Sequence, residues 1–137
     1  MNIDRYLRPV ELNPNYEGEG KLVVDALTGY EISKVSDRYT LVQNKDLVQP
    51  VIDYFGIEKL TKVREFNGNK SFIFEFQTGR EMDLGGGDIL KEKFLIRNSY
   101  DKTRSFSFMA GAFRMVCSNG LYVGIGTVME YRKIHIG

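Results

Sequence analysis

The sequence predicts an α+β fold in which a twisted, mostly antiparallel sheet of about five to seven strands packs one main helix, residues 45–55, on one face. Three observations carry this prediction: an Asn-Gly turn between two β-like runs, an alternating apolar run over residues 104–117, and one apolar stripe at helical spacing. Hairpin signals favour antiparallel pairing over alternating strand and helix units. A fully closed barrel is the structural alternative.

The chain of 137 residues fits one domain. Prolines and glycines without periodicity predict an irregular arm over residues 1–20, followed by a single α+β domain over residues 21–137. One cysteine cannot form an internal disulfide, no apolar run of about 18 residues occurs, and the polar start MNIDRYLRPVEL is unlike a secretory signal. We therefore expect a cytoplasmic protein of the host cell that has no membrane partner.

The first half of the chain predicts short strands at residues 22–24 and 39–42 and then the main helix. Asn44 or Asp46 is the expected N-cap, and Gly56 the expected left-handed C-cap. Pro50 then falls in the first turns, where a missing amide hydrogen is least harmful. The residues that form the apolar stripe of this helix are Leu47, Val48, Val51, Ile52 and Phe55.

An Asn-Gly turn at residues 67–68 joins two β-like runs, because this pair supplies the positive φ angles of a tight turn. A two-residue turn pairs Phe66 with Asn69 and Val63 with Phe72. The face that we expect to be buried carries Phe72, Phe74 and Phe76. The other face is an ordinary solvent face or a nucleic-acid platform, and it carries Lys62, Arg64 and Ser71.

The alternating run over residues 104–117 predicts a second long strand, with a bulge or close approach at Gly111. A turn at Asn119 and Gly120 leads into residues 121–128. Residues 129–137 supply a final amphipathic strand or the start of another element.

Charge is unevenly distributed along the sequence. Residues 1–88 contain 11 basic and 15 acidic residues, whereas residues 89–137 contain 8 basic and 3 acidic residues. A basic C-terminal half can bind a phosphate backbone if several of its cations share one face. The candidate nucleic-acid-binding residues are Arg97, Asn98, Lys102, Arg104, Arg114, Asn119, Arg132 and Lys133, with Tyr100, Tyr122 and Tyr131 as candidate stacking groups.

Some of these candidates also have structural interpretations. Asn98 and Asn119 are good turn formers. Arg114 lies within an apolar run, where a guanidinium needs a carboxylate partner or a ligand anion.

Catalytic chemistry is weakly indicated. Cys117 and the only histidine, His135, could meet across adjacent strands, but a cysteine in an apolar strand is typically a core residue. Asp83 and Asp88 flank three glycines and are weak candidates for a metal site, although such a run is typical of a flexible loop. We expect no catalytic residues and no cofactor, and the sequence favours a non-enzymatic protein.

Three segments resemble the phage/plasmid-like protein family, which is domain of unknown function 932 of prokaryotes. They are NSYD at residues 98–101, RMVCSN at residues 114–119 and RKIHIG at residues 132–137, and residues 36–51 resemble the entry strand and helix of the family. The resemblance covers about residues 31–137. The sequence departs from the family pattern at Tyr100, Lys102 and Ile136, where histidine, glycine and threonine are usual. Family members normally continue beyond this point, so we expect a short member or a shortened chain.

The resemblance implies a phage or mobile-element origin but no established activity. We therefore expect a non-enzymatic phage or plasmid protein of DNA metabolism that binds nucleic acid, such as single-stranded DNA or annealing intermediates, without sequence specificity. The alternative is an accessory or anti-defence protein that binds a host protein through a sheet edge or an apolar patch. Unpaired sheet edges could also support a homo-oligomer.

Overall fold

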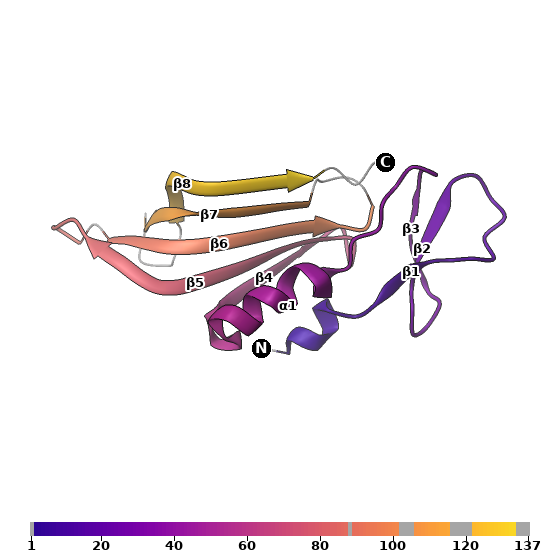
Figure 1. Cartoon of the computed structure of the whole chain (residues 1–137), viewed down its shortest axis with the longest axis horizontal. Helices are drawn as coiled ribbons and strands as arrows, with labels where there is room; N and C mark the ends of the chain where they lie inside the picture. Colours follow the sequence, from indigo (N-terminus) through magenta and orange to yellow (C-terminus); the bar gives the residue numbers. More distant parts are fainter. Residues whose placement is uncertain (1, 88, 102–105, 116–121, 134–137) are drawn as a thin grey trace.

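The structure is a computed structural model that describes residues 2–87, 89–101, 106–115 and 122–133, the last two ranges by their backbone. In the described chain, strands form an antiparallel three-stranded sheet in the order β1-β2-β3 and an antiparallel five-stranded sheet in the order β4-β5-β6-β7-β8. The helix α1 lies along one face of the larger sheet (Figure 1). The predicted α+β class is confirmed, although the strands are divided between two sheets.

The elements follow one another in a simple order along the chain. The N-terminal part contains the 3-10 helix η1 (Ile3–Tyr6) and the strands β1 (Val10–Leu12), β2 (Lys21–Asp25) and β3 (Glu31–Val35). The connection to the larger sheet contains α1 (Asn44–Phe55) and a second 3-10 helix, η2 (Ile57–Lys59). The larger sheet contains β4 (Leu60–Phe66), β5 (Ser71–Asp83), β6 (Ile89–Ser99), β7 (Phe106–Met115) and β8 (Tyr122–Lys133).

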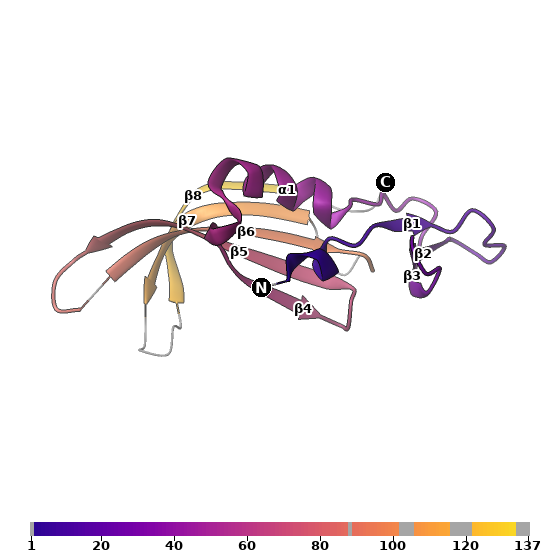
Figure 2. The same cartoon turned by 90° about the horizontal axis from the view of Figure 1, so that it is seen from below.

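The larger sheet is a meander in which each strand pairs with the next one along the chain. Its two edges are β4 and β8, so within the described residues the sheet is open and the closed-barrel alternative is wrong. α1 covers one face, and the end of β7 and the beginning of β8 bend toward the opposite side (Figure 2). A register shift between Ala110 and Gly111 accompanies this bend and confirms the predicted bulge.

The core forms between α1, the N-terminal part and one face of the larger sheet. Phe72, Phe74 and Phe76 are all buried, which confirms the predicted apolar face of β5. Ile96 of β6 and Val48 of α1 belong to the same cluster. On the other face Ser71 is buried, so it does not contribute to a solvent face as expected.

The hairpin of β4 and β5 has a longer turn than predicted. Phe66 pairs with Ser71 and not with Asn69, so residues 67–70 form a four-residue turn and the predicted register is wrong by two residues. A shift of two residues keeps each side chain on its predicted face, because side chains alternate with a period of two. The apolar pattern therefore cannot distinguish the two registers. The Asn-Gly pair does have the predicted positive φ angles, 54° and 71°.

The helix ends at Phe55 as predicted but begins one residue early, at Asn44, and its N-cap is different. Gln43 occupies the cap position without a side-chain cap bond, and its amide binds both backbone groups of Val10 in β1. Asn44 is the first helical residue, and its backbone N–H donates to the Tyr100 hydroxyl over 2.9 Å. At the other end, Gly56 has a φ of +96° and its amide donates to the Ile52 carbonyl. Tertiary contacts thus replace the local cap that the sequence predicts.

The N-terminal part contains more β-strands than the sequence pattern predicts. The strand expected at residues 22–24 lies within β2, whereas β1 and β3 were not anticipated. The strand expected at residues 39–42 is wrong: only Tyr39 makes an isolated bridge, because this segment links the two sheets. β1 lies within the predicted arm and pairs with β2. The division of the chain at residue 20 stays a prediction.

Candidate nucleic-acid interface

Side chains of strand β6 alternate between the two faces of the larger sheet. Phe94, Ile96 and Asn98 belong to the face that α1 covers, where Phe94 contacts Phe55 at 5.0 Å between ring centroids. Leu95 and Arg97 alternate with them and face the other way. No helix of the described chain packs on that opposite face (Figure 2). Arg97 therefore lies on the face that no described helix covers, which we call the uncovered face.

Strand β4 adds two further cations to the uncovered face. Arg64 pairs with Ile73 of β5, which pairs with Arg97 of β6, and Lys62 pairs with Glu75 one step along the strands. Lys62 and Arg64 are exposed and Arg97 is partly buried. We call Lys62, Arg64 and Arg97 the basic face.

The basic face carries cations without anionic partners in the described part of the chain. None of its side chains forms an ion pair there, and the buried Nε of Arg97 has no hydrogen-bond partner. Lys93, on the same side of β6, behaves differently because it is 2% exposed and its Nζ lies 3.2 Å from Glu75 Oε1. Glu75 therefore balances Lys93, and the basic face keeps its positive charge.

Two arginines of the N-terminal arm, on the side that α1 covers, are paired. Arg5 lies 3.0 Å from Glu65, and Arg8 donates through Nε and Nη2 to both carboxylate oxygens of Asp25 over 2.8 and 3.0 Å. These two arginines thus differ from Lys62, Arg64 and Arg97, which have no carboxylate partner in the described part of the chain. Several cations that share one face can neutralise successive phosphates of a nucleic-acid backbone.

The register brings two of the predicted site residues together and separates a third. Arg97 pairs with Ser107 of β7, and Ser107 pairs with Arg132 of β8, so Arg64, Arg97 and Arg132 occupy one row across the sheet. Lys133 is next along β8, opposite Phe106. Arg114 pairs with Leu90 near the far end of β6, well away from Arg97. Arg114 therefore does not belong to this row.

For several other predicted residues the structure does not describe the side chain. Lys102, Arg104, Asn119, Cys117, His135 and Asp88 lie outside the described residues, and Tyr122 and Tyr131 are described by their backbone. Asp83 is exposed, and one of its carboxylate oxygens accepts from the Gly85 amide in the turn after β5. No group of three metal-ligating side chains occurs among the described residues.

Asn98 was expected to contact nucleic acid, but it is a core residue with no exposed surface. Its Nδ2 donates to the Val42 carbonyl over 2.8 Å and to Asn44 Oδ1 over 2.9 Å. Asn44 Nδ2 in turn donates to the Tyr6 carbonyl. Asn98 therefore joins β6 to the start of α1 and, through Asn44, to the N-terminal arm.

Tyr100 was expected to stack on a base at the surface, yet it is 2% exposed. Its carbonyl accepts from the Ser33 hydroxyl, and Tyr39 donates from its hydroxyl to the neighbouring Ser99 carbonyl. Burial raises the pKa of Tyr100 to about 12 and raises the pKa of Tyr39 above its usual range. Both phenols are therefore neutral at physiological pH. The Tyr39 and Tyr100 hydroxyls join the end of β6 to the connecting segment and to α1, whereas the Ser33 hydroxyl joins it to β3.

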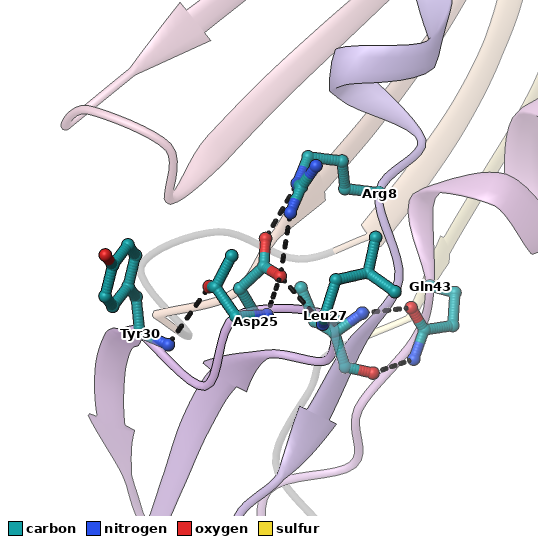
Figure 3. A network of polar contacts seen from close by, with 7 residues as sticks. Arg8, Asp25, Leu27, Tyr30 and Gln43 are labelled. Carbon is teal, nitrogen blue, oxygen red and sulfur yellow. Dashed lines mark hydrogen bonds and ion pairs between the residues drawn. The ribbon is translucent and has the colours of Figure 1, made fainter.

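A second polar network ties the N-terminal arm to β2 (Figure 3). Asp25 accepts from Arg8 and also from the backbone amides of Leu27 and Thr28. Hydrogen bonding by Arg8 holds the pKa of the Asp25 carboxyl well below its usual range, and burial opposes this shift. The same interactions raise the pKa of Arg8. The ionised pair thus anchors the arm at neutral pH.

The lowered pKa of Asp25 predicts that part of the stability of the fold is lost in acid. A depressed folded-state pKa contributes stability that is present above the unfolded value, about 4, and that declines as the pH falls below it. Asp25→Asn removes this titration. The difference in melting temperature between the wild type and Asp25→Asn should therefore shrink between pH 7 and pH 3. A difference that stays constant over this range would show that the pair does not contribute.

Lys62 and Arg64 are residues that the sequence suggested but did not assign. Their alternation beside the Asn-Gly turn showed that they share a face. The sequence near the turn could not show that Arg97 of β6 lies on the same face, because this depends on how β5 and β6 pair. Arg5 and Arg8 gave no signal, because they lie in a segment without periodicity. In the described residues no helix is both long enough and apolar enough to cross a membrane.

A family model described as "Domain of unknown function (DUF932)" matches residues 31–137, which is most of the chain. The matched range includes the whole larger sheet, α1 and β3. No solved structure matches the chain.

Proposed function

We propose that this chain, which belongs to the family described as Domain of unknown function (DUF932), binds nucleic acid without reading its sequence. The interface is the basic face of the larger sheet, and the ligand is single-stranded DNA or an annealing intermediate. One observation carries the proposal: among the described residues, Lys62, Arg64 and Arg97 share the uncovered face and have no anionic partner there.

The spacing of the row supports a backbone ligand. Neighbouring strands lie about 4.8 Å apart, so Arg64 and Arg97 are about 10 Å apart across β5, and Arg132 is about 10 Å further across β7. Phosphates of a stacked strand follow one another at about 3.4 Å of rise. Successive arginines of the row therefore match phosphates about three nucleotides apart. Such contacts position a strand but read no bases.

Reversing the charge of the basic face should weaken binding. Lys62→Glu/Arg64→Glu is expected to lower the affinity for a labelled single strand about tenfold or more at low salt, and equally for different base sequences. The slope of log K against log salt should fall by about 1.4, which corresponds to two lost phosphate contacts on a single strand. Fluorescence anisotropy at several salt concentrations measures both quantities.

A matched control separates this site from net charge. Lys34→Glu/Lys45→Glu makes the same change in charge at exposed positions on β3 and α1, away from the basic face. This control should retain most of the affinity of the wild type. Equal weakening in both double variants, or no binding by the wild type at low salt, would rule out the basic face as the interface.

The proposed setting is the DNA metabolism of a phage or plasmid, as the family resemblance implies, and the proposed role is non-enzymatic. The alternative interface with a host protein has weaker support. Exposed large apolar side chains of the described residues lie at three separate places: Leu27 with Tyr30, Tyr54 with Ile57, and Met82 with Leu84. Scattered apolar side chains of this kind are ordinary on protein surfaces. Self-association also stays a prediction.

A further inference from the structure

A pocket of about 220 Å³ opens on the other side of the larger sheet from the basic face. It lies where the N-terminal arm, the three-stranded sheet and the turn between β4 and β5 meet. Its lining includes Arg5, Arg8, Asn69, Phe72 and Tyr100. The basic face shares none of these residues, so the pocket is a separate site.

The floor of the pocket is aromatic and apolar. Phe72 lies edge-on to two rings, with centroid distances of 6.5 Å to Tyr6 and 5.7 Å to Tyr100. Phe72 and Tyr100 are almost fully buried, as are Ile32 and Val10 beside them. Tyr6, which is only partly buried, is the ring of this group that leaves surface for a flat apolar ring of the ligand.

The rim of the pocket carries two ordered guanidinium groups, Arg5 and Arg8, together with their carboxylate partners, Glu65 and Asp25. The Arg5 guanidinium lies 4.9 Å from the centroid of the Tyr6 ring and is bound to Glu65 through Nη2. The Arg8 guanidinium is fixed by its two bonds to Asp25 (Figure 3). Because a guanidinium has five N–H donors, both arginines keep donors that have no partner in the described part of the chain. Two ordered guanidinium groups with remaining donors are suited to a phosphate.

Asn69 completes the set of groups around the pocket. It is exposed in the turn after β4, and in the described structure its side-chain amide makes no hydrogen bond. A carboxamide offers one acceptor and two donors, which complement the polar edge of a heterocyclic ring. We infer that this pocket binds an aromatic heterocycle that carries a phosphate group, which is the chemistry of a nucleotide.

Calorimetric titration of the whole chain with adenosine 5′-monophosphate, adenosine and inorganic phosphate tests the inference. The monophosphate should bind with one site per chain and more tightly than either fragment, because only the monophosphate uses both the floor and the rim. No binding of the monophosphate at millimolar concentration, or binding no tighter than that of phosphate alone, would overturn the inference.

Two variants and a control locate the site. Arg5→Ala and Asn69→Ala each remove one exposed group of the pocket, and each should weaken binding of the monophosphate about tenfold, the effect of one hydrogen bond to a charged or polar ligand. Lys34→Ala, at an exposed position of β3 that does not border the pocket, should leave it unchanged. Thermal melts of the two pocket variants check that the fold is kept. Equal affinity in the wild type and both pocket variants would place the nucleotide elsewhere.

A free nucleotide and the phosphorylated end of a nucleic-acid strand both carry a heterocycle with a phosphate group. Competition between the monophosphate and short single strands distinguishes these two ligands. A single strand with a 5′-phosphate should displace the monophosphate better than the same strand with a 5′-hydroxyl if the pocket binds strand ends. Displacement by mononucleotides alone assigns the pocket to a free nucleotide. The inference does not depend on the basic face: loss of strand binding in Lys62→Glu/Arg64→Glu with normal binding of the monophosphate, or the reverse, separates the two proposals.

Discussion

Asn98→Asp is expected to destabilise the fold by about 3 kcal/mol or more at pH 7. The change replaces the Nδ2 donor with an oxygen, at a place 2.8 Å from the Val42 carbonyl oxygen and 2.9 Å from Asn44 Oδ1. Both hydrogen bonds are lost and three oxygens face one another without exposure to water. Denaturant unfolding followed by circular dichroism measures the loss.

The penalty of Asn98→Asp should also depend on pH. Burial favours the neutral form of the new carboxyl and raises its pKa in the folded state, so the penalty is complete above that pKa and shrinks below it. Asn69→Asp makes the same chemical change at an exposed turn position, where the expected effect is within about 0.5 kcal/mol. Similar losses in both variants would show that Asn98 does not hold β6 to α1.

Phe74→Ala is expected to cost about 3–5 kcal/mol, because it removes a fully buried ring from the centre of the core. Phe74 stacks on Phe72 with a centroid distance of 6.2 Å, and it belongs to the cluster that includes Val48 and Ile96. The cavity that alanine leaves would lie between α1 and the larger sheet. The free energy of unfolding in urea measures this cost.

Tyr54→Ala provides the comparison for Phe74→Ala. Tyr54 is also aromatic and contacts Phe55 edge-on, but it is 83% exposed on α1. Its loss should change the free energy of unfolding by less than about 1 kcal/mol. A cost for Phe74→Ala that is no larger than the cost for Tyr54→Ala would contradict the assignment of the core to this face of β5.

The chemistry of the candidate site was only partly predictable. The basic half of the chain pointed to Arg97 and Arg132, and the register places both in one row. The same reasoning chose Asn98 and Tyr100, which are buried because the start of α1 and the segment before it pack on the end of β6. A polar residue beside a turn has the same sequence signature whether it faces solvent or a neighbouring segment. Burial is decided by the rest of the chain.

The sequence by itself determined the features that depend on neighbouring residues. Alternation predicted the buried face of β5 and the run of β7, apolar spacing predicted α1, and the Asn-Gly pair predicted a turn with positive φ. Each of these follows from backbone geometry within a few residues.

Only the tertiary structure decided which segments meet. A register shift of two residues preserves every face, so alternation could not set the turn of β4 and β5. The cap of α1 is made by a hydroxyl 56 residues away along the chain, and the arm is held by Gln43 and Asp25 from other elements. The basic face and the pocket beside the N-terminal arm likewise require strands and an arm that are distant in sequence. Contacts of this kind depend on the free energy of the whole packed chain, and no local pattern encodes them.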